Sequence, residues 1–289
     1  MTTLLIGANG QLGCELRQVF AGSDLVPLTH GDFELTDPAQ VRDALRTYKP
    51  GLILNTAAYH RVDECEDYPE RAFAVNAVAV RDLALAAREI GATLVHFSTD
   101  YVFDGWQRSP YREVDPPRPL SVYAASKLVG EYFIRAALPQ HFVIRTCGLY
   151  GLAGSQSKGG NFVETMLRLA REGREIRVVG DQIATPTSAK ELARKIRQLV
   201  GTGVYGVYHI TNSGECSWYQ FAKAIFELVG ISARLSETTS ASHSARAARP
   251  AYSVLDNANL RSLDLDDMRE WRDALADYLT ERGRLHGDT

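Results

Sequence analysis

The chain has 289 residues, 45% of them hydrophobic, so it can bury the core of one large domain or of a main domain with a smaller one. Its formal net charge of −3 and pI near 6.2 show no basic excess, which argues against nucleic acid or an anionic membrane surface as a partner. We find neither a leader peptide nor an apolar run of membrane-spanning length, and therefore expect a cytoplasmic protein. Four cysteines without C-x-x-C spacing disfavour both a zinc site and a disulfide framework: Cys14, Cys65, Cys147 and Cys216.

The N-terminus begins with a short apolar strand that leads directly into three glycines, Gly7, Gly10 and Gly13. In this order the first glycine permits a tight turn, the second lets the backbone approach a pyrophosphate, and the third lets helix and strand pack closely. A helix predicted over 11–20 would point its N-terminal amides at the phosphates. An ordinary glycine-rich turn is the alternative, but the order of strand, glycines and helix disfavours it. The predicted cofactor-binding residues of this loop are Gly7, Asn9, Gly10, Gln11, Leu12 and Gly13.

Strands and helices alternate through the first half of the chain. Apolar runs predict strands at 25–28, 52–54, 93–97 and 142–145. Helical periodicity predicts helices at 39–47, 69–90 and 121–137. Repeated strand–helix–strand units indicate an α/β fold with a Rossmann-type, doubly wound parallel sheet, in which ligands bind at the carboxyl ends of the strands.

The second half is less regular and predicts a smaller C-terminal lobe. Helices are expected near 161–172, 188–199, 218–229 and 266–282, with short strands near 176–179 and 207–210. We therefore expect a dinucleotide-binding domain at 1–145, with returning segments at about 180–210, and a lobe formed mainly by 146–289. Residues 236–249 are rich in Ser, Thr, Ala and Arg without periodicity, which predicts a mobile surface loop.

Tyr123 and Lys127 are four residues apart in the helix predicted over 121–137. They therefore share one helix face, where the ammonium can hold the phenol near ionisation and let it act as an acid. Reduction of a carbonyl needs such an acid. The spacing alone is weak evidence, because most Tyr-x-x-x-Lys pairs belong to a solvated helix face.

Several longer motifs accompany this pair and the glycine loop. They are Asn55-Thr56-Ala57-Ala58-Tyr59, Thr99-Asp100-Tyr101-Val102-Phe103-Asp104-Gly105 and Gly180-Asp181-Gln182-Ile183-Ala184-Thr185-Pro186-Thr187. Together the motifs resemble those of the extended short-chain dehydrogenase/reductases and, more narrowly, of the dTDP-4-dehydrorhamnose reductases. The resemblance covers nearly the whole chain.

The resemblance implies reduction of the C4 ketone of dTDP-4-dehydro-6-deoxy-L-mannose by a nicotinamide cofactor, which gives dTDP-L-rhamnose. Tyr123 would protonate the developing alkoxide, and Lys127 would lower its pKa and hold the cofactor ribose. Thr99 would hydrogen-bond the same oxygen, although a Thr at a strand end also commonly caps the local backbone. Residues 146–289 would mainly form the substrate-binding lobe.

Other substrate contacts are expected beside Thr99, each with a structural alternative. Asp100 would orient a substrate hydroxyl or tie down the following loop. Tyr101 would line the sugar pocket, although an apolar run beside a strand is more often core. Arg249 is the candidate for the diphosphate, because a guanidinium suits bidentate phosphate recognition, and a surface arginine is the competing interpretation.

The predicted cofactor is NADPH, with NADH left open. The strand at 25–28 ends in Thr29-His30 and lacks the acidic residue that would grip an NAD ribose and repel a 2′-phosphate. The resemblance places Asp32 and Phe33 near the adenine. It places Ala57, Ala58 and Tyr59 along the ribose and pyrophosphate.

Gly148 departs from the family pattern, since many rhamnose-pathway reductases carry an aromatic residue there. A reductase of another dTDP-4-keto-deoxysugar therefore stays open, as does a non-catalytic, NADP-binding regulatory subunit resembling that of methionine adenosyltransferase. A nucleotide-sugar epimerase or dehydratase is a third alternative, but the dehydratase Asp-Glu pair is missing after Thr99. Some bacterial relatives pair through magnesium near positions matching Glu15 and Glu191. We expect no metal here, interpret both as solvated helix carboxylates, and leave a homodimer open.

Overall fold

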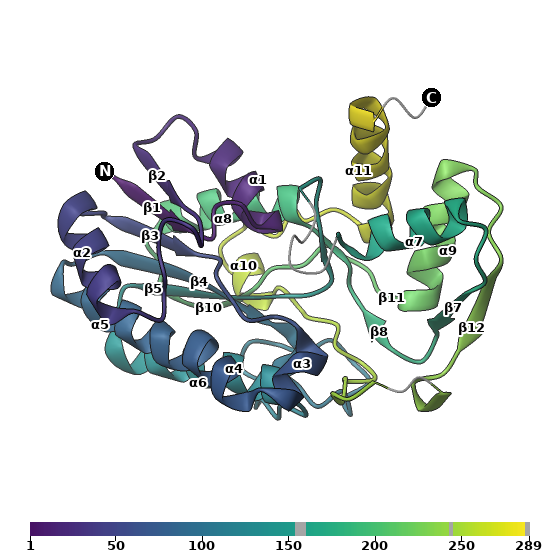
Figure 1. Cartoon of the computed structure of the whole chain (residues 1–289), viewed down its shortest axis with the longest axis horizontal. Coiled ribbons are helices and arrows are strands. Elements are labelled where there is room, and N and C mark those ends of the chain that lie inside the picture. Colours follow the sequence, from purple (N-terminus) through teal and green to yellow (C-terminus); the bar gives the residue numbers. More distant parts are fainter. Residues whose placement is uncertain (154–159, 243–244, 287–289) are drawn as a thin grey trace.

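A six-stranded sheet forms the centre of the computed structural model, which describes residues 1–153, 160–242 and 245–286 (Figure 1). Its order is β2-β1-β3-β4-β5-β10, and every neighbouring pair is parallel. The strands are β1 (Thr3–Ile6), β2 (Leu25–Leu28), β3 (Leu52–Asn55), β4 (Thr93–Thr99), β5 (His141–Thr146) and β10 (Gly206–His209). Because β2 and β3 flank β1 on opposite sides, the order reverses between β1 and β3, where such sheets bind ligands. The predicted doubly wound sheet is confirmed.

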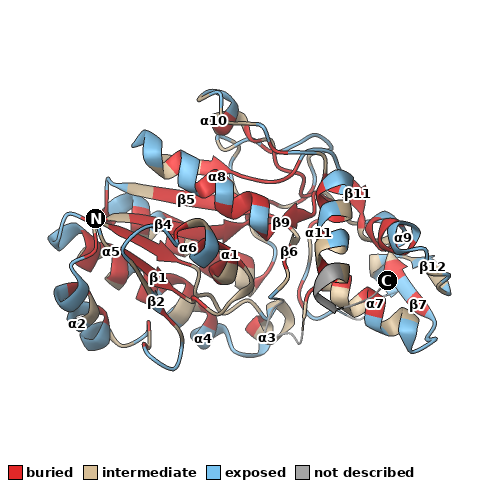
Figure 2. Ribbon diagram, turned by 90° about the horizontal axis from the view of Figure 1, so that it is seen from above, coloured by how far each residue is buried: buried red, intermediate tan, exposed pale blue. Residues whose placement is uncertain are grey.

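Helices cover both faces of the sheet. On one face lie α1 (Gln11–Val19) and α8 (Ala189–Thr202), and on the other lie α2 (Pro38–Tyr48), α5 (Ala79–Glu89) and α6 (Val122–Ala137) (Figure 1). The strands β1 and β3 are buried along their whole length, as the red ribbon of Figure 2 shows. Burial on both faces explains why these strands are continuous apolar runs without alternation.

The helix predicted at 69–90 is interrupted in the structure. The chain forms α4 (Pro69–Phe73), then a π-helical turn η1 (Ala74–Val78), and then α5. The buried Asn76 lies in this π-turn, and its side-chain oxygen accepts a hydrogen bond from the Tyr59 backbone N–H at 2.8 Å. A π-turn adds a residue to a helical turn, which hydrophobic periodicity does not reveal. The short helix α3 (Val62–Asp67), which precedes α4, was absent from the prediction.

The second half of the chain builds a further apolar cluster away from the sheet (right side of Figure 1). It contains α7 (Phe162–Arg171), α9 (Trp218–Val229), α11 (Trp271–His286) and the parallel pair β7 (Ile176–Val179) and β12 (Leu235–Thr238). Two short pairs join it to the sheet region: β6 (Leu149–Tyr150) with β9 (Thr187–Ser188), and β8 (Ile183–Ala184) with β11 (Cys216–Ser217). The last predicted helix begins at Trp271 and not near 266. The chain before it contains the small helix α10 (Ala258–Arg261).

The surface loop predicted at 236–249 is wrong at its start, where the chain forms a strand. Strand β12 continues through Thr238 in register with β7, and a 3-10 turn η4 (Ser240–Ser242) follows it. The Asp181 carboxylate accepts hydrogen bonds from the backbone N–H and the hydroxyl of Ser240. Ala247 is buried, whereas residues 243–244 lie outside the described residues. Pairing with a distant strand supplies the order that the local composition does not predict.

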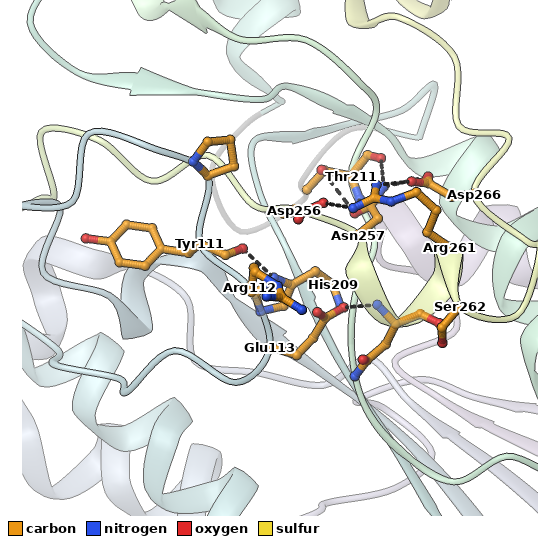
Figure 3. A network of polar contacts seen from close by, with 12 residues as sticks. Tyr111, Arg112, Glu113, His209, Thr211, Asp256, Asn257, Arg261, Ser262 and Asp266 are labelled. Atoms are coloured by element: carbon orange, nitrogen blue, oxygen red, sulfur yellow. Dashed lines mark hydrogen bonds and ion pairs between the residues drawn. The ribbon is translucent and has the colours of Figure 1, made fainter.

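Polar contacts hold the segment that connects β4 to α6 (Figure 3). The Glu113 carboxylate accepts hydrogen bonds from the backbone N–H groups of His209 at 3.0 Å and Asn259 at 3.1 Å. The Tyr111 carbonyl lies 3.0 Å from His209 Nδ1. The Tyr111 ring stacks on the Phe103 ring at a centroid distance of 4.2 Å. These contacts fix the segment that leads from the 99–105 motif to Tyr123.

Disulfides, membrane-spanning helices and clustered metal ligands are absent from the described part of the chain. None of the four cysteines forms a disulfide within 1–153, 160–242 and 245–286. No helix in these ranges combines the length and hydropathy that crossing a membrane requires. Nor do the described residues contain three or more His, Cys, Asp or Glu side chains grouped to hold a metal ion.

Candidate active site

The glycine loop lies between β1 and α1, at the point where the strand order reverses. Gly7 has φ +80°, and a Cβ there would lie 2.5 Å from Thr56 Oγ1, so both backbone conformation and space require glycine. A Cβ on Gly13 would lie 2.2 Å from the Gly7 carbonyl oxygen, which explains the close packing of helix on strand. A Cβ on Gly10 would meet, apart from its chain neighbours, only the Gly7 carbonyl oxygen at 3.2 Å within 4 Å, so described side chains leave this position open.

The N-terminus of α1 is suited to an anion. No side chain caps this end, since Gly10 is the N-cap residue and makes no side-chain hydrogen bond. The first turn of a helix leaves backbone N–H groups without intrahelical acceptors, and the helix dipole adds positive potential. Gln11 turns its side chain away from this end and donates to the Leu149 carbonyl at 2.8 Å, while Leu12 is buried in the core. The loop therefore has the space, the donors and the field that a pyrophosphate needs.

The segment after β3 forms the second wall of this site. Thr56 Oγ1 donates to the Ile6 carbonyl at 2.8 Å, which joins the ends of β3 and β1. Asn76 bonds both backbone groups of Tyr59, accepting from its N–H at 2.8 Å and donating to its carbonyl at 2.9 Å. The amide of Asn76 also donates to Ser126 Oγ at 3.0 Å, so the π-turn connects this wall to helix α6. Ala57, Ala58 and Tyr59 are all partly exposed along it.

The two residues expected near the adenine have different surroundings. Phe33 is buried in the core beneath β2, whereas Asp32 is exposed. The Asp32 carboxylate accepts hydrogen bonds from the backbone N–H of Thr29 at 3.0 Å and from its hydroxyl at 2.6 Å, and these bonds lower the pKa of Asp32. His30 is exposed and lies 3.5 Å from Glu34. Asp32 is thus bound to Thr29 at the end of β2.

Thr99 and Tyr123 meet at the carboxyl edge of the sheet. Thr99 ends β4, and its hydroxyl accepts the Tyr101 N–H at 3.2 Å while it also hydrogen-bonds the Tyr123 phenol. The rings of Tyr101 and Tyr123 meet edge to face with centroids 6.2 Å apart. Ser121 caps helix α6 by accepting the Ala124 N–H, which fixes the first turn that carries Tyr123. The backbone cap expected of Thr99 is present and its hydroxyl lies beside the phenol, while its hydrogen bond to the substrate oxygen stays a prediction.

Burial sets the charge states of Tyr123 and Lys127. Burial raises the pKa of Tyr123, and the hydrogen bond with Thr99 opposes that rise only in part. Lys127 is 1% exposed, and its Nζ lies 3.1 Å from Nε2 of the buried His96. Burial lowers the pKa of Lys127 to about 8, with the Glu131 carboxylate acting in the opposite direction. Tyr123 is therefore a protonated phenol at neutral pH, and the expected action of Lys127 on its pKa stays a prediction.

Asp100 is enclosed by donors from the protein. Its carboxylate accepts hydrogen bonds from Ser253 Oγ at 2.6 Å, from Cys147 Sγ at 3.0 Å and from Thr99 Oγ1 at 3.1 Å. Burial raises the pKa of Asp100, and these three bonds counteract the rise. The contacts favour the second of the two roles considered from the sequence, in which Asp100 ties down the 99–105 segment. Val102 and Phe103 are likewise fully buried core.

Arg249 lies within a set of contacts at the site. Its guanidinium donates to the Asp63 carboxylate at 2.9 Å and to the Ala247 carbonyl at 3.1 Å, and it hydrogen-bonds Tyr101. Asp63 belongs to the unpredicted helix α3, and its bonds with Arg249 lower its pKa. Thus α3 positions a cation beside Tyr101. Arg249 is half-buried and bound to Asp63, which disfavours its interpretation as a surface arginine.

An aromatic side chain borders Gly148, where the sequence lacks one. Gly148 has φ +55°, and a Cβ there would lie 3.1 Å from Pro186 Cα and 3.4 Å from the Trp218 ring. Trp218 begins α9 and packs against Phe162 with ring centroids 4.9 Å apart. Trp218 is not recognisable as a site residue from the sequence, because only the fold brings it beside a residue 70 positions earlier in the chain. No local signal could have found it.

Known proteins match this chain over most of its length. The family described as RmlD substrate binding domain matches residues 1–283. Spore coat polysaccharide biosynthesis protein SpsK of Bacillus subtilis (strain 168) is 42% identical over 285 residues, 98% of this chain and 98% of that protein. A probable dTDP-4,6-dihydroxy-2-methyloxan-3-one 4-ketoreductase of Streptomyces antibioticus is 41% identical over 281 residues, covering 95% of this chain and 93% of that one.

A solved structure shows the same fold with a nucleotide bound. The dTDP-4-dehydrorhamnose reductase from Bacillus anthracis str. Ames, determined in complex with NADP, has a TM-score of 0.92 and 37% identity, covering 97% of this chain and 99% of that one. The resemblance drawn from the sequence motifs is thereby confirmed. The glycine loop, the 99–105 segment and the Tyr123–Lys127 helix stand in a chain that belongs to the RmlD substrate binding domain family.

Proposed function

We propose that this protein is an NADPH-dependent reductase of the C4 ketone of dTDP-4-dehydro-6-deoxy-L-mannose, with dTDP-L-rhamnose as the product. The observation that carries this proposal is the meeting of the Thr99 hydroxyl and the Tyr123 phenol at the carboxyl edge of the sheet. Beside them lies a glycine loop with room for a pyrophosphate. The family membership supports the same reaction, and the NADP complex of the Bacillus anthracis relative supports the cofactor.

The cofactor would be held mainly by the backbone around β1 and β3. Gly10 and the N-terminus of α1 would receive the pyrophosphate, and the partly exposed 57–59 segment would border the ribose. The absence of an acidic residue directly after β2 favours a cofactor with a 2′-phosphate. When bound, NADPH supplies the hydride that adds to the ketone carbon.

Tyr123 would provide the proton that completes the reduction. As the carbonyl oxygen gains negative charge, the phenol donates its proton to that oxygen, and the Thr99 hydroxyl stabilises it by a hydrogen bond. A raised phenol pKa keeps Tyr123 protonated before the reaction, as an acid must be. Lys127 would border the ribose and balance the charge left on the phenolate. The alcohol product thus takes its hydrogen on carbon from the cofactor and its hydrogen on oxygen from Tyr123.

Substrate recognition would use the surface between the sheet edge and the C-terminal lobe. Arg249 would bind the diphosphate, because a guanidinium held by Asp63 presents its remaining donors in a fixed plane. Tyr101 would border the sugar beside Tyr123, and Asp100 would position this segment from beneath. We propose further that residues 146–289 mainly form the substrate-binding lobe, with 180–210 returning to the dinucleotide-binding domain of 1–145.

A reductase of another dTDP-4-keto-deoxysugar is the second candidate. The specific observation in its favour is Trp218, which occupies the neighbourhood of Gly148 from a different element. An aromatic wall supplied by α9 could shape the pocket for a sugar with a different substitution pattern. The similarity to a probable ketoreductase of another dTDP-linked sugar points in the same direction.

The test is to mix the full-length protein with NADPH and each dTDP-4-keto-deoxysugar, and to follow NADPH absorbance. We expect oxidation with dTDP-4-dehydro-6-deoxy-L-mannose, formation of dTDP-L-rhamnose, and its loss in Tyr123→Phe. Faster turnover with another dTDP-4-keto sugar would select the second candidate. Tight NADPH binding without oxidation in the presence of any such sugar would refute the reductase proposal and favour a regulatory subunit.

A further inference from the structure

The buried side chains of Lys127, His96 and Asn55 form a hydrogen-bonded line that begins at helix α6. Lys127 Nζ lies 3.1 Å from His96 Nε2, and His96 Nδ1 lies 3.2 Å from Asn55 Nδ2. The other atom of the Asn55 amide, Oδ1, lies 3.2 Å from the backbone nitrogen of Ala57. His96 and Asn55 are 0% exposed and Lys127 is 1% exposed, so water does not take part in this line.

The direction of each hydrogen bond follows from the backbone group at its end. The Ala57 N–H can only donate, so the Asn55 atom that faces it must be the oxygen. The Asn55 amino group therefore faces His96 Nδ1 and donates to it, which requires a lone pair on that ring nitrogen. Burial holds the pKa of His96 well below its ordinary value, so the imidazole is neutral and carries its single hydrogen on Nε2.

This tautomer presents an N–H to Lys127. An ammonium group has three donors and no acceptor, so a charged Lys127 would meet the His96 Nε2–H as donor against donor. The uncharged amine has one lone pair, which can accept that hydrogen. A separation of 3.1 Å is a normal N–H···N distance for the amine and an unfavourable one for the ammonium.

The remaining groups around Lys127 do not reverse this preference. Glu131, one turn further along α6, favours the charged lysine, but its carboxylate is already bound by Arg145 of β5 at 2.7 Å and by the Ser98 hydroxyl. Tyr123, one turn before Lys127, is a neutral phenol at neutral pH. Burial itself lowers the pKa of Lys127 to about 8.

We propose that Asn55 and His96 are positioning residues that favour the uncharged amine of Lys127 while the cofactor site is empty, through the tautomer that Asn55 imposes on His96. New acceptors that reach Nζ, such as hydroxyl oxygens of a bound ribose, then raise the charged fraction of Lys127. Charge at the catalytic lysine is thus coupled to occupation of the site. This inference rests on the proposed function for the role of Lys127 in catalysis, but its test does not require turnover.

Asn55→Asp is the informative variant, because it should exchange donor and acceptor along this hydrogen-bonded line with little change in side-chain shape. One Asp oxygen still accepts the Ala57 N–H, while the other can only accept and so requires a hydrogen on His96 Nδ1. His96 Nε2 then offers a lone pair, which suits the ammonium. The added carboxylate would also favour a charged lysine through space, so the effect must be measured with and without the imidazole.

Nuclear magnetic resonance of the full-length, cofactor-free protein gives both readouts. The ¹⁵N shifts of His96 report which ring nitrogen carries hydrogen, and the ¹³Cε shift of Lys127, assigned by its loss in Lys127→Met, reports the charge of the amine. The chain has six lysines, which keeps the spectrum tractable. We expect hydrogen on Nε2 in the wild type and on Nδ1 in Asn55→Asp. We also expect the wild-type Lys127 to titrate at least about two units below the ordinary lysine value of about 10.4. In Asn55→Asp its midpoint should lie about one unit or more above the wild-type midpoint.

The control is Asn55→Asp in a variant that lacks the His96 imidazole. In a His96→Met background, Asn55→Asp should raise the Lys127 midpoint by less than half as much, since only the charge remains. The proposal is overturned if wild-type His96 carries its hydrogen on Nδ1, if Lys127 titrates with the exposed lysines, or if the full rise persists in the His96→Met background. Should the Met variants not fold, the ring-nitrogen shifts of wild type and Asn55→Asp decide alone. Failure of the reductase proposal appears separately, as absence of NADPH oxidation.

Discussion

Removal of the Glu131 carboxylate should strongly destabilise the fold, because it leaves a cation buried without its partner. Glu131 is 0% exposed and Arg145 is 3% exposed, and they are joined by bonds of 2.7 Å from Nη2 and 3.0 Å from Nε. In Glu131→Ala the guanidinium keeps its contacts with neutral groups, His209 Nε2 at 3.4 Å and the Phe103 ring centroid at 5.3 Å. Ser98 also loses the acceptor of its hydroxyl. We expect a loss of about 3–5 kcal/mol in the free energy of unfolding.

Thermal and urea unfolding followed by circular dichroism measure this loss. At roughly 2–4 °C per kcal/mol for a chain of this size class, the midpoint should fall by on the order of 10 °C. The matched control is the double variant Glu131→Met with Arg145→Met, which removes both charges and refills the volume. It should be less destabilised than Glu131→Ala, since replacing a whole buried pair by apolar groups is often nearly neutral. A loss below about 1 kcal/mol in Glu131→Ala, or a double variant that is the less stable of the two, would refute the reasoning.

Three further outcomes are expected. Tyr123→Phe should lower kcat by about 10²–10⁴-fold, because it removes the proton donor, while the NADPH dissociation constant stays within twofold by fluorescence titration; near-normal kcat would exclude Tyr123 as the acid. Gly10→Val should abolish NADPH binding by filling the space before α1, and unchanged affinity would contradict the placement of the pyrophosphate. The bonds from Arg249 lower the pKa of Asp63 in the folded state, so they add stability above its unfolded pKa of about 3.9 that is lost as the pH falls further. Asp63→Asn should therefore flatten the acid side of a plot of unfolding temperature against pH, and an unchanged slope would show that the pair contributes nothing.

Features encoded within a few adjacent residues were predicted correctly from the sequence. The glycine loop is one example, since positive φ at Gly7 and the tight packing at Gly13 follow directly from the missing side chains. The strands of the central sheet are another, because burial on both faces leaves uninterrupted apolar runs such as Leu52–Asn55. The family resemblance then extended these local patterns to a substrate and a cofactor.

Features that depend on distant parts of the chain were missed. The pairing of β12 with β7 gives order to a segment whose composition resembles a loop. Arg249 meets Asp63 across 186 positions, and the sequence gives no sign of that contact. His96 is an inconspicuous residue within an apolar strand, and only the fold brings its ring to Lys127. Side-chain networks of this kind determine charge states, so the chemistry of the site was less predictable than its location.

The π-turn at Ala74–Val78 limits how this part of the chain can change in length. A π-turn contains one residue more than an α-helical turn, and each residue of an α-helix corresponds to a rotation of about 100°. Deleting one residue to restore a straight helix would therefore turn Asn76 away from Tyr59 or turn the apolar face of α5 away from the sheet. Asn76 and the apolar face of α5 are buried, and the extra residue lets both keep their contacts. Single-residue deletions within 74–78 should accordingly be far less tolerated than equal deletions at the exposed end of α5.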